Sequence, residues 1–309
     1  MHNVLVTGAS GFVGRAVGTA IEQRGWHVRR ASRNGGDGCL AMGEIDGRTD
    51  WSSALAGCDA VVHLAARVHM MGRAEAADTA AFMTTNRDAT IKLAEDAARA
   101  GVKRLVFMST VKVNGEGRAL PYRADEPPAP EGAYAVSKWQ AEQGLHEVAA
   151  RTGLEVVIIR PPLVYGPGVK GNFRSLINLV RRGVPLPLGS VRNRRSLVGV
   201  TNLASAVCAA LEHPAAAGRT YLVSDQDDLS VPDLIRAIAR AAEVPARLVP
   251  FLPAPLRLVS AMVGRQQSFQ QVAGSLTVDS SAISRELGWR PVRSVDEELA
   301  ETLAALKRP

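Results

Sequence analysis

Two short stretches of the sequence hold residue types that could do chemistry, and the first is TGASGFVG at residues 7–14. Its glycines, Gly8, Gly11 and Gly14, lie three residues apart where an apolar strand-like run gives way to a helical pattern. Glycine at such a turn lets a ligand approach the backbone closely, and the N-terminus of the following helix attracts an anion. The turn therefore predicts a diphosphate-binding site, although a tight turn with three small residues would have the same sequence.

The second stretch, YAVSK, places Tyr134 and Lys138 four residues apart in a helical pattern, so that both side chains share one face. A phenol has a pKa of about 10, and a neighbouring ammonium group favours the phenolate and lowers that pKa. The pair could therefore donate or accept a proton during catalysis. Taken alone, the same spacing also suits an ordinary surface tyrosine and lysine.

The segments around these stretches alternate between short apolar runs and longer helical patterns. Strands are predicted at residues 3–7, 27–31, 60–64, 103–108 and 154–160, and helices at 12–24, 80–100 and 133–152. Near-continuous apolar strands separated by helices predict a parallel sheet that is covered on both faces. The expected fold class is therefore α/β, a doubly wound Rossmann sheet whose first strand-to-helix turn holds the glycines.

After about residue 165 the pattern changes to loop-rich segments such as GPGVKG and RGVPLPLGS, followed by helices between short strands. These later helices are predicted at 201–212, 230–242, 279–287 and 294–306. We therefore expect a dinucleotide-binding Rossmann domain at 1–165 and a smaller mixed substrate-binding domain at 166–309, interleaved at an approximate boundary. Ligands of open α/β sheets bind at the carboxyl ends of the strands, so the smaller domain is expected to cover that edge.

Composition excludes several classes of protein. The chain has 309 residues, of which 46% are hydrophobic, and this content supports a large core rather than disorder. Its three cysteines are odd in number and lack metal-ligand spacing, which favours a reducing cytoplasm over disulfides or a zinc site. We see no signal segment and no run of about 18 apolar residues, the length that a membrane span needs. The longest candidate, at 251–264, is broken by prolines and Arg257, so a cytoplasmic location is expected.

The formal net charge of +7 is consistent with an anionic partner. Arginines gather in RRGVPLPLGSVRNRRS at residues 181–196, without the interleaved aromatic residues or the motifs typical of nucleic-acid binding. A phosphorylated small molecule is therefore the expected partner, and nucleic acid is not expected. A scattered, solvated basic surface would explain the same charge.

Taken together, the TGxxGxxG turn and the YxxxK helix resemble the extended short-chain dehydrogenase/reductase family, of the NAD-dependent epimerase/dehydratase type. The resemblance covers nearly the whole chain and includes HLAA (63–66), FMSTVKVNG (107–115), RPPLVYGPG (160–168), RRSLVGVTNLA (194–204) and LGWRP (287–291). It implies an enzyme in which hydride moves between a nicotinamide cofactor and a sugar carbon that bears a hydroxyl or carbonyl group. It also implies a homodimer, formed through the helices at 80–100 and 133–152.

The resemblance implies cofactor-binding roles for residues that match the family's motifs, in the glycine turn and in the loops after later strands. These residues are Gly8, Ser10, Gly11, Phe12, Val13, Gly14, Glu44, Ile45, Leu64, Ala65, Ala66 and Pro161. Asn86 matches a structural asparagine of the helix after the third strand. His63, inside the third apolar run, is expected to be a satisfied core histidine, and no cluster of His, Cys and Asp suggests a metal.

The resemblance also implies the catalytic residues. Tyr134 would be the acid/base, and Lys138 would tune it and hold the nicotinamide ribose. Thr110, four residues before the pair NG at 114–115, matches the family's catalytic Ser/Thr, and Ser109 is the second choice. A threonine hydroxyl at this place would hydrogen-bond the reacting oxygen of the substrate while the phenol transfers the proton.

The second predicted strand and its continuation, HVRRASRNGG, contain no carboxylate between residues 27 and 36. NAD-selective relatives carry an acidic residue there that accepts hydrogen bonds from the ribose hydroxyls. Arg30 and Arg33 stand in this segment instead, and a guanidinium group suits a 2′-phosphate. NADP(H) is therefore the favoured cofactor, with NAD(H) as the alternative if an arginine only stacks on the adenine.

The resemblance to relatives that use nucleotide-diphosphate sugars implies that Asn172 and Arg195 grip the substrate diphosphate, with Arg192 and Arg194 as neighbours. The sequence departs from the family's pattern in two places. The usual RDFIHVDDLA reads RRSLVGVTNLA here, and a late substrate contact is missing from FQQVAGSLTVD at 269–279. Sugar contacts in that late region are therefore not assigned.

The family's 4,6-dehydratases carry Asp-Glu directly after the catalytic threonine, whereas Thr110 is followed by Val111 and Lys112. A dehydratase is therefore disfavoured, which leaves a 4-epimerase or a reductase that consumes NADPH. The segments 193–203 and 221–230 are similar to bacterial reductases of UDP-4-keto-6-deoxy-N-acetylhexosamines from surface-polysaccharide pathways. That reductase is the favoured function, and UDP-hexose 4-epimerase is the alternative. A catalytically silent NADP-binding sensor is a third interpretation, but such relatives lose the Tyr or the Lys that is present here.

Overall fold

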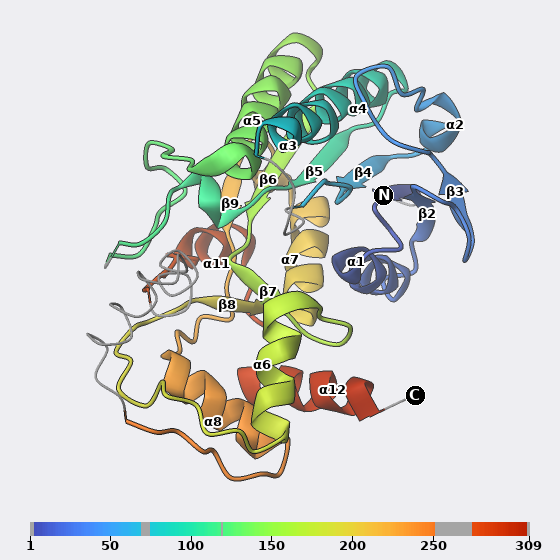
Figure 1. Cartoon of the computed structure of the whole chain (residues 1–309). Helices are drawn as coiled ribbons and strands as arrows, with labels where there is room; N and C mark the ends of the chain where they lie inside the picture. The colour runs from blue at the N-terminus through green and yellow to red at the C-terminus, as the bar shows by residue number, and fades with distance from the viewer. Residues whose placement is uncertain (1–2, 69–74, 119, 251–273, 308–309) are drawn as a thin grey trace.

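The computed structural model describes residues 3–68, 75–118, 120–250 and 274–307. A seven-stranded sheet runs through the molecule in the order β3-β2-β1-β4-β5-β6-β9, with helices on both of its faces (Figure 1). Its strands, all paired in parallel, are β1 (Asn3–Thr7), β2 (His27–Ser32), β3 (Cys39–Ala41), β4 (Ala60–His63), β5 (Arg104–Met108), β6 (Glu155–Arg160) and β9 (Thr220–Leu222). The predicted doubly wound α/β fold is confirmed.

The central strands form because their side chains are apolar on both faces of the sheet. In β1, Val4, Leu5 and Val6 are fully buried, as are Val61 and Val62 of β4. Strands with this composition suit a parallel sheet between two helical layers. Because β1 lies between β2 and β4, the direction of winding changes there, and the loops after β1 and β4 open side by side. Such a switch point is where open α/β sheets bind their ligands.

Two layers of helices cover the sheet. On one face lie α1 (Phe12–Glu22) and α7 (Val200–Glu212), which pack against each other. On the other face lie α2 (Ser52–Leu55), α4 (Ala89–Arg99) and α5 (Gly132–Thr152). The helices α4 and α5 therefore cover the same face of the sheet, and they contact each other in the upper part of Figure 1.

The helix predicted at 80–100 is divided into three parts. They are α3 (Glu75–Phe82), the π-helical turn η1 (Met83–Asp88) and α4. A π-helical turn changes which side chains face inward, and such turns occur often at functional sites. Here the turn buries Asn86 completely.

A third core lies beyond the carboxyl ends of the strands, in the lower part of Figure 1. It is built from α6 (Gly171–Arg181), α8 (Val231–Ala241) and α12 (Val295–Lys307), next to the short parallel pair of β7 (Leu163–Tyr165) and β8 (Leu197–Gly199). The predicted helices of this region are present, including α11 (Ser281–Leu287). Because α7 and β9 return to the main sheet, the chain beyond residue 165 contributes to both parts. The division into domains at 165/166 stays a prediction.

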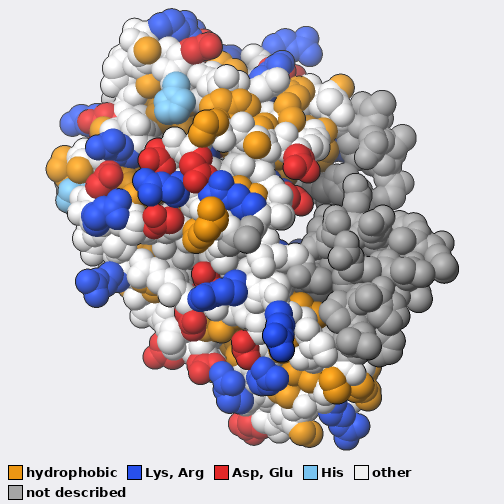
Figure 2. All heavy atoms as spheres, turned by 90° about the vertical axis from the view of Figure 1, so that its left-hand side faces the viewer, with side chains coloured by type: hydrophobic (Ala, Val, Ile, Leu, Met, Phe, Trp, Pro, Cys, Tyr) orange, Lys and Arg blue, Asp and Glu red, His pale blue; other side chains and the backbone are white. Residues whose placement is uncertain are grey.

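The apolar segment 251–264 lies outside the described residues, as does the first part of 269–279. Among the helices that are described, none is both long and apolar enough to cross a bilayer. On the face displayed in Figure 2, Lys and Arg side chains lie interspersed with Asp and Glu side chains. The positive charge of the chain therefore does not form one uninterrupted basic patch on this face.

Candidate active site

The glycine turn after β1 is packed so closely that only glycine fits at Gly8 and Gly14, and a Cβ on Gly11 would lie a tight 3.0 Å from the carbonyl oxygen of Gly8. Gly8 has a φ of +68°, and a Cβ built on it would lie 2.8 Å from the backbone nitrogen of Ala65. A Cβ on Gly14 would overlap the carbonyl oxygen of Gly8. The helix α1 begins at Phe12, directly after Gly11, without a side-chain cap, so its first N–H groups are available to a ligand. This backbone cradle fits the pyrophosphate of a dinucleotide.

The loop after β4 is fastened to the glycine turn by Thr7. The Oγ1 atom of Thr7 accepts hydrogen bonds from the backbone N–H groups of Leu64 and Ala65, each at 3.2 Å. The structure thus brings together two of the regions that were predicted to line the cofactor. Ala66 follows in the same loop and is half-buried.

His63 is a buried, satisfied histidine, as the sequence predicts. Its Nδ1 atom lies 2.7 Å from Thr7 Oγ1, and its Nε2 atom lies 2.9 Å from Thr90 Oγ1. Burial, together with the nearby charge of Lys138, lowers the pKa of His63 to about 3, so the ring is neutral at physiological pH. His63 therefore supports the site and does not act as an acid or a base.

Asn86 has the structural role that the resemblance implied. Its side-chain oxygen accepts from the N–H of Arg67 at 2.8 Å, and its amide donates to the carbonyl oxygen of Arg67 at 3.1 Å. The same amide donates to Ser137 Oγ at 3.0 Å, and Ser137 Oγ donates to the carbonyl oxygen of Tyr134 at 2.8 Å. Asn86 therefore connects the loop after β4 to the helix that carries Tyr134.

The two arginines predicted near the cofactor ribose occupy different places. Arg33, just after β2, is exposed and forms an ion pair with Glu44, with Nη1 and Oε1 at 3.1 Å. Arg30 instead lies along α1, where its Nη1 atom is 2.7 Å from Glu22 Oε1 and its guanidinium group contacts Gly18. The position of Arg30 therefore does not favour a 2′-phosphate contact, and only Arg33 stays a candidate for that role.

The predicted catalytic residues converge at the carboxyl end of β5. Lys138 Nζ donates to the carbonyl oxygen of Met108 at 2.9 Å and lies 4.5 Å from the centroid of the Phe107 ring. Thr110 follows Met108 by two residues and caps the 3-10 turn η2 (Val111–Val113), whose Lys112 N–H donates to Thr110 Oγ1 at 3.3 Å.

The other two predicted residues in this region are Tyr134 on α5 and Pro161, which directly follows β6. Tyr134 lies one helical turn before Lys138 on α5, and its ring packs edge-on against Phe82 at 6.0 Å. The carbonyl oxygen of Pro161 accepts from the Val111 N–H at 3.0 Å, which places Pro161 beside the loop of Thr110.

The pKa values of the Tyr134–Lys138 pair differ from the expectation. Burial raises the pKa of Tyr134 to about 12, whereas a lowered value was expected from the lysine. Burial likewise lowers the pKa of Lys138 to about 7, and the carboxylate of Glu142 opposes that change. The expectation was wrong because it counted the charge of the lysine and not the loss of water around both groups. At neutral pH, Tyr134 is a protonated phenol and can donate a proton.

A buried carboxylate near Thr110, that of Glu142, was not predicted from the sequence. Glu142 lies four residues after Lys138 on α5 and is fully buried. Its carboxylate accepts hydrogen bonds from Ser109 Oγ and from the guanidinium group of Arg160, which also forms an ion pair with it. The spacing of four residues from Lys138 was the available signal, because it places Glu142 on the same helix face.

The predicted substrate residues lie beyond the carboxyl ends of the strands. Asn172 and Arg192 are exposed, the former at the start of α6. Arg195 is half-buried, and its Nη1 donates to the carbonyl oxygen of Gly274 at 3.0 Å. Burial lowers the pKa of Arg195, and the charge of Glu116, six residues after Thr110, opposes this change.

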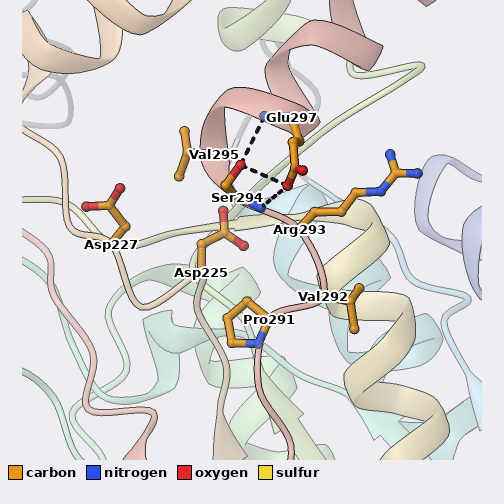
Figure 3. Close-up of a pocket in the computed structure, with 8 residues that line it drawn as sticks. All are labelled: Asp225, Asp227, Pro291, Val292, Arg293, Ser294, Val295 and Glu297. Atoms are coloured by element: carbon orange, nitrogen blue, oxygen red, sulfur yellow. Dashed lines mark hydrogen bonds between the residues drawn. The ribbon is translucent and has the colours of Figure 1, made fainter.

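A cavity of about 330 Å³ lies elsewhere, between the start of α12 and the segment after β9 (Figure 3). Several of its polar groups have partners within the protein. Ser294 N and Oγ donate to Glu297 Oε2, and Glu297 N donates back to Ser294 Oγ, which is the capping box of α12. Asp225 accepts from Tyr165 Oη at 2.8 Å. This cavity contains none of the predicted catalytic residues, and we assign it a structural role.

Comparison with known proteins identifies the family of this chain. The model of the family described as "NAD dependent epimerase/dehydratase family" matches residues 4–224. A Vibrio cholerae protein named UDP-glucose 4-epimerase is 38% identical over 311 residues, covering 98% of this chain and 95% of its own.

Two more distant relatives extend the comparison. An Escherichia coli O157:H7 protein named N-acetyl-alpha-D-glucosaminyl-diphospho-ditrans,octacis-undecaprenol 4-epimerase is 29% identical, covering 81% of this chain and 76% of its own. The solved structure of UDP-N-acetylglucosamine 4-epimerase from Bacillus cereus has a TM-score of 0.82 at 22% identity, covering 100% of this chain and 98% of its own. With a matching family model over most of its length and a near full-length relative, this chain belongs to the NAD-dependent epimerase/dehydratase family of enzymes.

Proposed function

We propose that the protein is an NADPH-dependent reductase of a UDP-4-keto-6-deoxy-N-acetylhexosamine, which acts at sugar C4 in surface-polysaccharide synthesis. The broader class, a nucleotide-sugar enzyme of the epimerase/dehydratase type, follows from the family and its relatives. The observation that carries the finer proposal is the end of β2, where Arg33 is exposed and no carboxylate occurs between residues 27 and 36. A reaction that consumes its reductant suits NADPH, and Arg33 offers a guanidinium group to the 2′-phosphate.

The chain's own residues account for the proton and for the orientation of the substrate. A bound nicotinamide cofactor would supply the hydride that sugar C4 receives. Tyr134, protonated at neutral pH, would donate its phenolic proton to the oxygen on C4, so that a carbonyl group becomes a hydroxyl group. Thr110 would hydrogen-bond the same oxygen, and Lys138 would hold the nicotinamide ribose and favour the phenolate after the proton has left.

The proposed cofactor site uses the backbone of the glycine turn for the pyrophosphate and the loop after β4 for the nicotinamide half. Glu44 and Ile45 would lie beside the adenine. In this arrangement Arg33 exchanges its ion pair with Glu44 for the 2′-phosphate, which carries more charge than a carboxylate. NAD(H) is the alternative cofactor, and its ribose hydroxyls would then lie beside the exposed ion pair of Arg33 and Glu44.

The proposed substrate site uses Asn172, Arg192 and Arg195 for the diphosphate of the nucleotide sugar. Arg195 is the strongest of the three because it is half-buried, and a partly desolvated guanidinium group binds phosphate oxygens more strongly than an exposed one. The proposed biological unit is a homodimer, formed through the helices within 80–100 and 133–152.

UDP-hexose 4-epimerase is the second candidate function. The near full-length Vibrio cholerae relative favours it, because its printed name is UDP-glucose 4-epimerase. An epimerase would use the same Thr110, Tyr134 and Lys138, since it oxidises and then reduces the same carbon. The two functions differ in whether the cofactor is consumed.

A panel of UDP-hexoses and UDP-4-keto-6-deoxy-N-acetylhexosamines, each tested with NADPH and with NADH, separates the two candidates. We expect turnover of a 4-keto sugar with loss of reduced-nicotinamide absorbance, and a lower KM for NADPH than for NADH. Conversion of UDP-glucose to UDP-galactose without any change in that absorbance would establish the epimerase instead. Cofactor binding without turnover of any sugar would favour the sensor interpretation.

A further inference from the structure

We propose that the buried Glu142–Arg160 ion pair is a positioning device that holds the loop of Thr110 at both of its ends, through Ser109 and Asn114, against the helix of Tyr134 and Lys138. The proposal rests on the proposed C4 chemistry, because it assigns a role toward the residues of that reaction. It concerns positioning residues, since neither member of the ion pair is placed where it would contact the substrate.

The first end of the loop is held by Glu142. Ser109, which directly precedes Thr110, is 4% exposed, and its hydroxyl donates to Glu142 Oε1. Its backbone N–H donates to the carbonyl oxygen of Ile159 on β6 at 2.8 Å. Ser109 is therefore fixed both by its backbone and by its side chain, which leaves the next residue, Thr110, little freedom to shift.

The second end of the loop is held by Arg160, the last residue of β6. Its Nη1 atom donates to Asn114 Oδ1 at 3.1 Å, and its Nε atom donates to Glu142 Oε1 at 3.0 Å. The amide of Asn114 donates in turn to the carbonyl oxygen of Arg123 at 2.8 Å. Because one guanidinium group joins Glu142 to Asn114, the helix α5 and both ends of the loop form one hydrogen-bonded unit.

The same carboxylate faces the ammonium group of Lys138. Glu142 and Lys138 are one helical turn apart on α5, where side chains four residues apart are neighbours. Tyr134 lies one helical turn before Lys138 on α5, and His63 on β4 senses the lysine charge. From β5 Lys138 contacts the Met108 carbonyl oxygen and the Phe107 ring. The charge of Glu142 favours the protonated lysine, so that the same group positions the loop and tunes the catalytic pair.

A purely structural ion pair should affect stability without affecting kcat, and the protein contains one between β5 and β6. Arg104, the first residue of β5, is 4% exposed and pairs with Glu155, the first residue of β6, with Nε and Oε2 at 2.8 Å. This pair lies at the amino ends of the strands, opposite the site. Glu155→Gln is therefore the control for Glu142→Gln, with a smaller expected change in Tm because Glu155 is half-buried and Glu142 is fully buried.

The first test compares the steady-state kinetics of Ser109→Ala, Ser109→Thr, Glu142→Gln and Glu155→Gln, with thermal unfolding of each. We expect Ser109→Ala and Glu142→Gln to lower kcat by about ten- to hundredfold, with KM and cofactor affinity within about twofold of wild type. Ser109→Thr keeps a hydroxyl donor and should retain most of kcat, and Glu155→Gln should change Tm without changing kcat. Wild-type kcat in folded Ser109→Ala, or equal loss of kcat in Glu142→Gln and Glu155→Gln, would overturn the proposal.

The second test needs no substrate and therefore does not depend on the proposed reaction. The pKa of Lys138 is measured by NMR on protein with ¹³C-labelled lysine, with the Lys138 signal assigned from Lys138→Arg. Glu142→Gln should lower this pKa, and Glu155→Gln should leave it unchanged. An unchanged Lys138 pKa in Glu142→Gln would contradict the tuning role. Failure of every sugar to react would leave this measurement intact and would count only against the proposed function.

Discussion

Replacing Lys138 by methionine should stabilise the folded protein near neutral pH, although it removes a catalytic residue. Lys138 is 2% exposed, and burial lowers its pKa from the ordinary 10.5 to about 7. The folded protein must therefore either keep a poorly hydrated ammonium group or release its proton, and both cost free energy. Methionine fills a similar volume without the charge.

The magnitude follows from the two pKa values. The folded-state pKa lies below the unfolded value, so the unfolded state binds more protons between pH 7 and pH 10.5, and the wild-type stability rises with pH in that window. One pKa unit corresponds to about 1.4 kcal/mol. From pH 6 to pH 9 the contribution of Lys138 to the wild-type free energy of unfolding should rise by about 2.7 kcal/mol, which corresponds to roughly two pKa units. Lys138→Met should lack this rise. In Lys138→Met the Met108 carbonyl oxygen loses its hydrogen bond from Lys138. At pH 6 this loss offsets about 1–3 kcal/mol of the stability that the methionine variant gains.

The assay is urea-induced unfolding of wild type, Lys138→Met and the control Lys103→Met at several pH values from 6 to 9. Lys103 is exposed, so its replacement should leave the pH dependence of stability unchanged. The stability difference between wild type and Lys138→Met should shrink or change sign as the pH rises. A difference that stays constant with pH would show that Lys138 has an ordinary pKa, and the reasoning from burial would then be wrong.

Three further predictions concern the site. Arg33→Ala should weaken NADPH binding by about 1–3 kcal/mol, the range for a hydrogen bond to a charged group, and leave NADH binding nearly unchanged in calorimetry; equal affinities of the wild type for both cofactors would refute it. Tyr134→Phe should lower kcat by about 10²–10⁴ with NADPH binding intact, and wild-type turnover would mean that the proton comes from another group. Arg195→Ala should raise KM for the nucleotide sugar but not for the cofactor, with exposed Arg181→Ala as the control, and parallel loss of both affinities would indicate a folding role.

Much of the fold could be predicted because its central strands are short, nearly continuous apolar runs. β1, β4, β5 and β6 begin and end within one residue of the predicted bounds. The three-residue strand β3 was not predicted, because so short a segment carries no periodicity that distinguishes it from a loop. The π-helical turn η1 was not predicted either, since its six residues are too few for a change of period to show in the sequence.

The site was predictable where it depends on local sequence and less so where it depends on packing. The glycine turn could be recognised because its three glycines lie three residues apart directly after a strand, and at Gly8 and Gly14 a side chain would overlap backbone atoms. The ion pair of Arg30 with Glu22 on α1 could not be read from the sequence, because it depends on how the side chains of β2 alternate between the two faces of the sheet. The raised pKa of Tyr134 could not be predicted, because the extent of burial of the Tyr134–Lys138 pair is set by the tertiary structure.

The most direct test of the central claim follows the hydride itself. The protein is incubated with a UDP-4-keto-6-deoxy-N-acetylhexosamine and NADPH that carries deuterium on nicotinamide C4, labelled separately on each face. We predict that one NADP⁺ forms for each product molecule. With one of the two labelled cofactors, the product should carry one deuterium at sugar C4, as measured by mass spectrometry and NMR. Product that carries no deuterium with either cofactor, or interconversion of UDP-hexoses without net oxidation of NADPH, would contradict it.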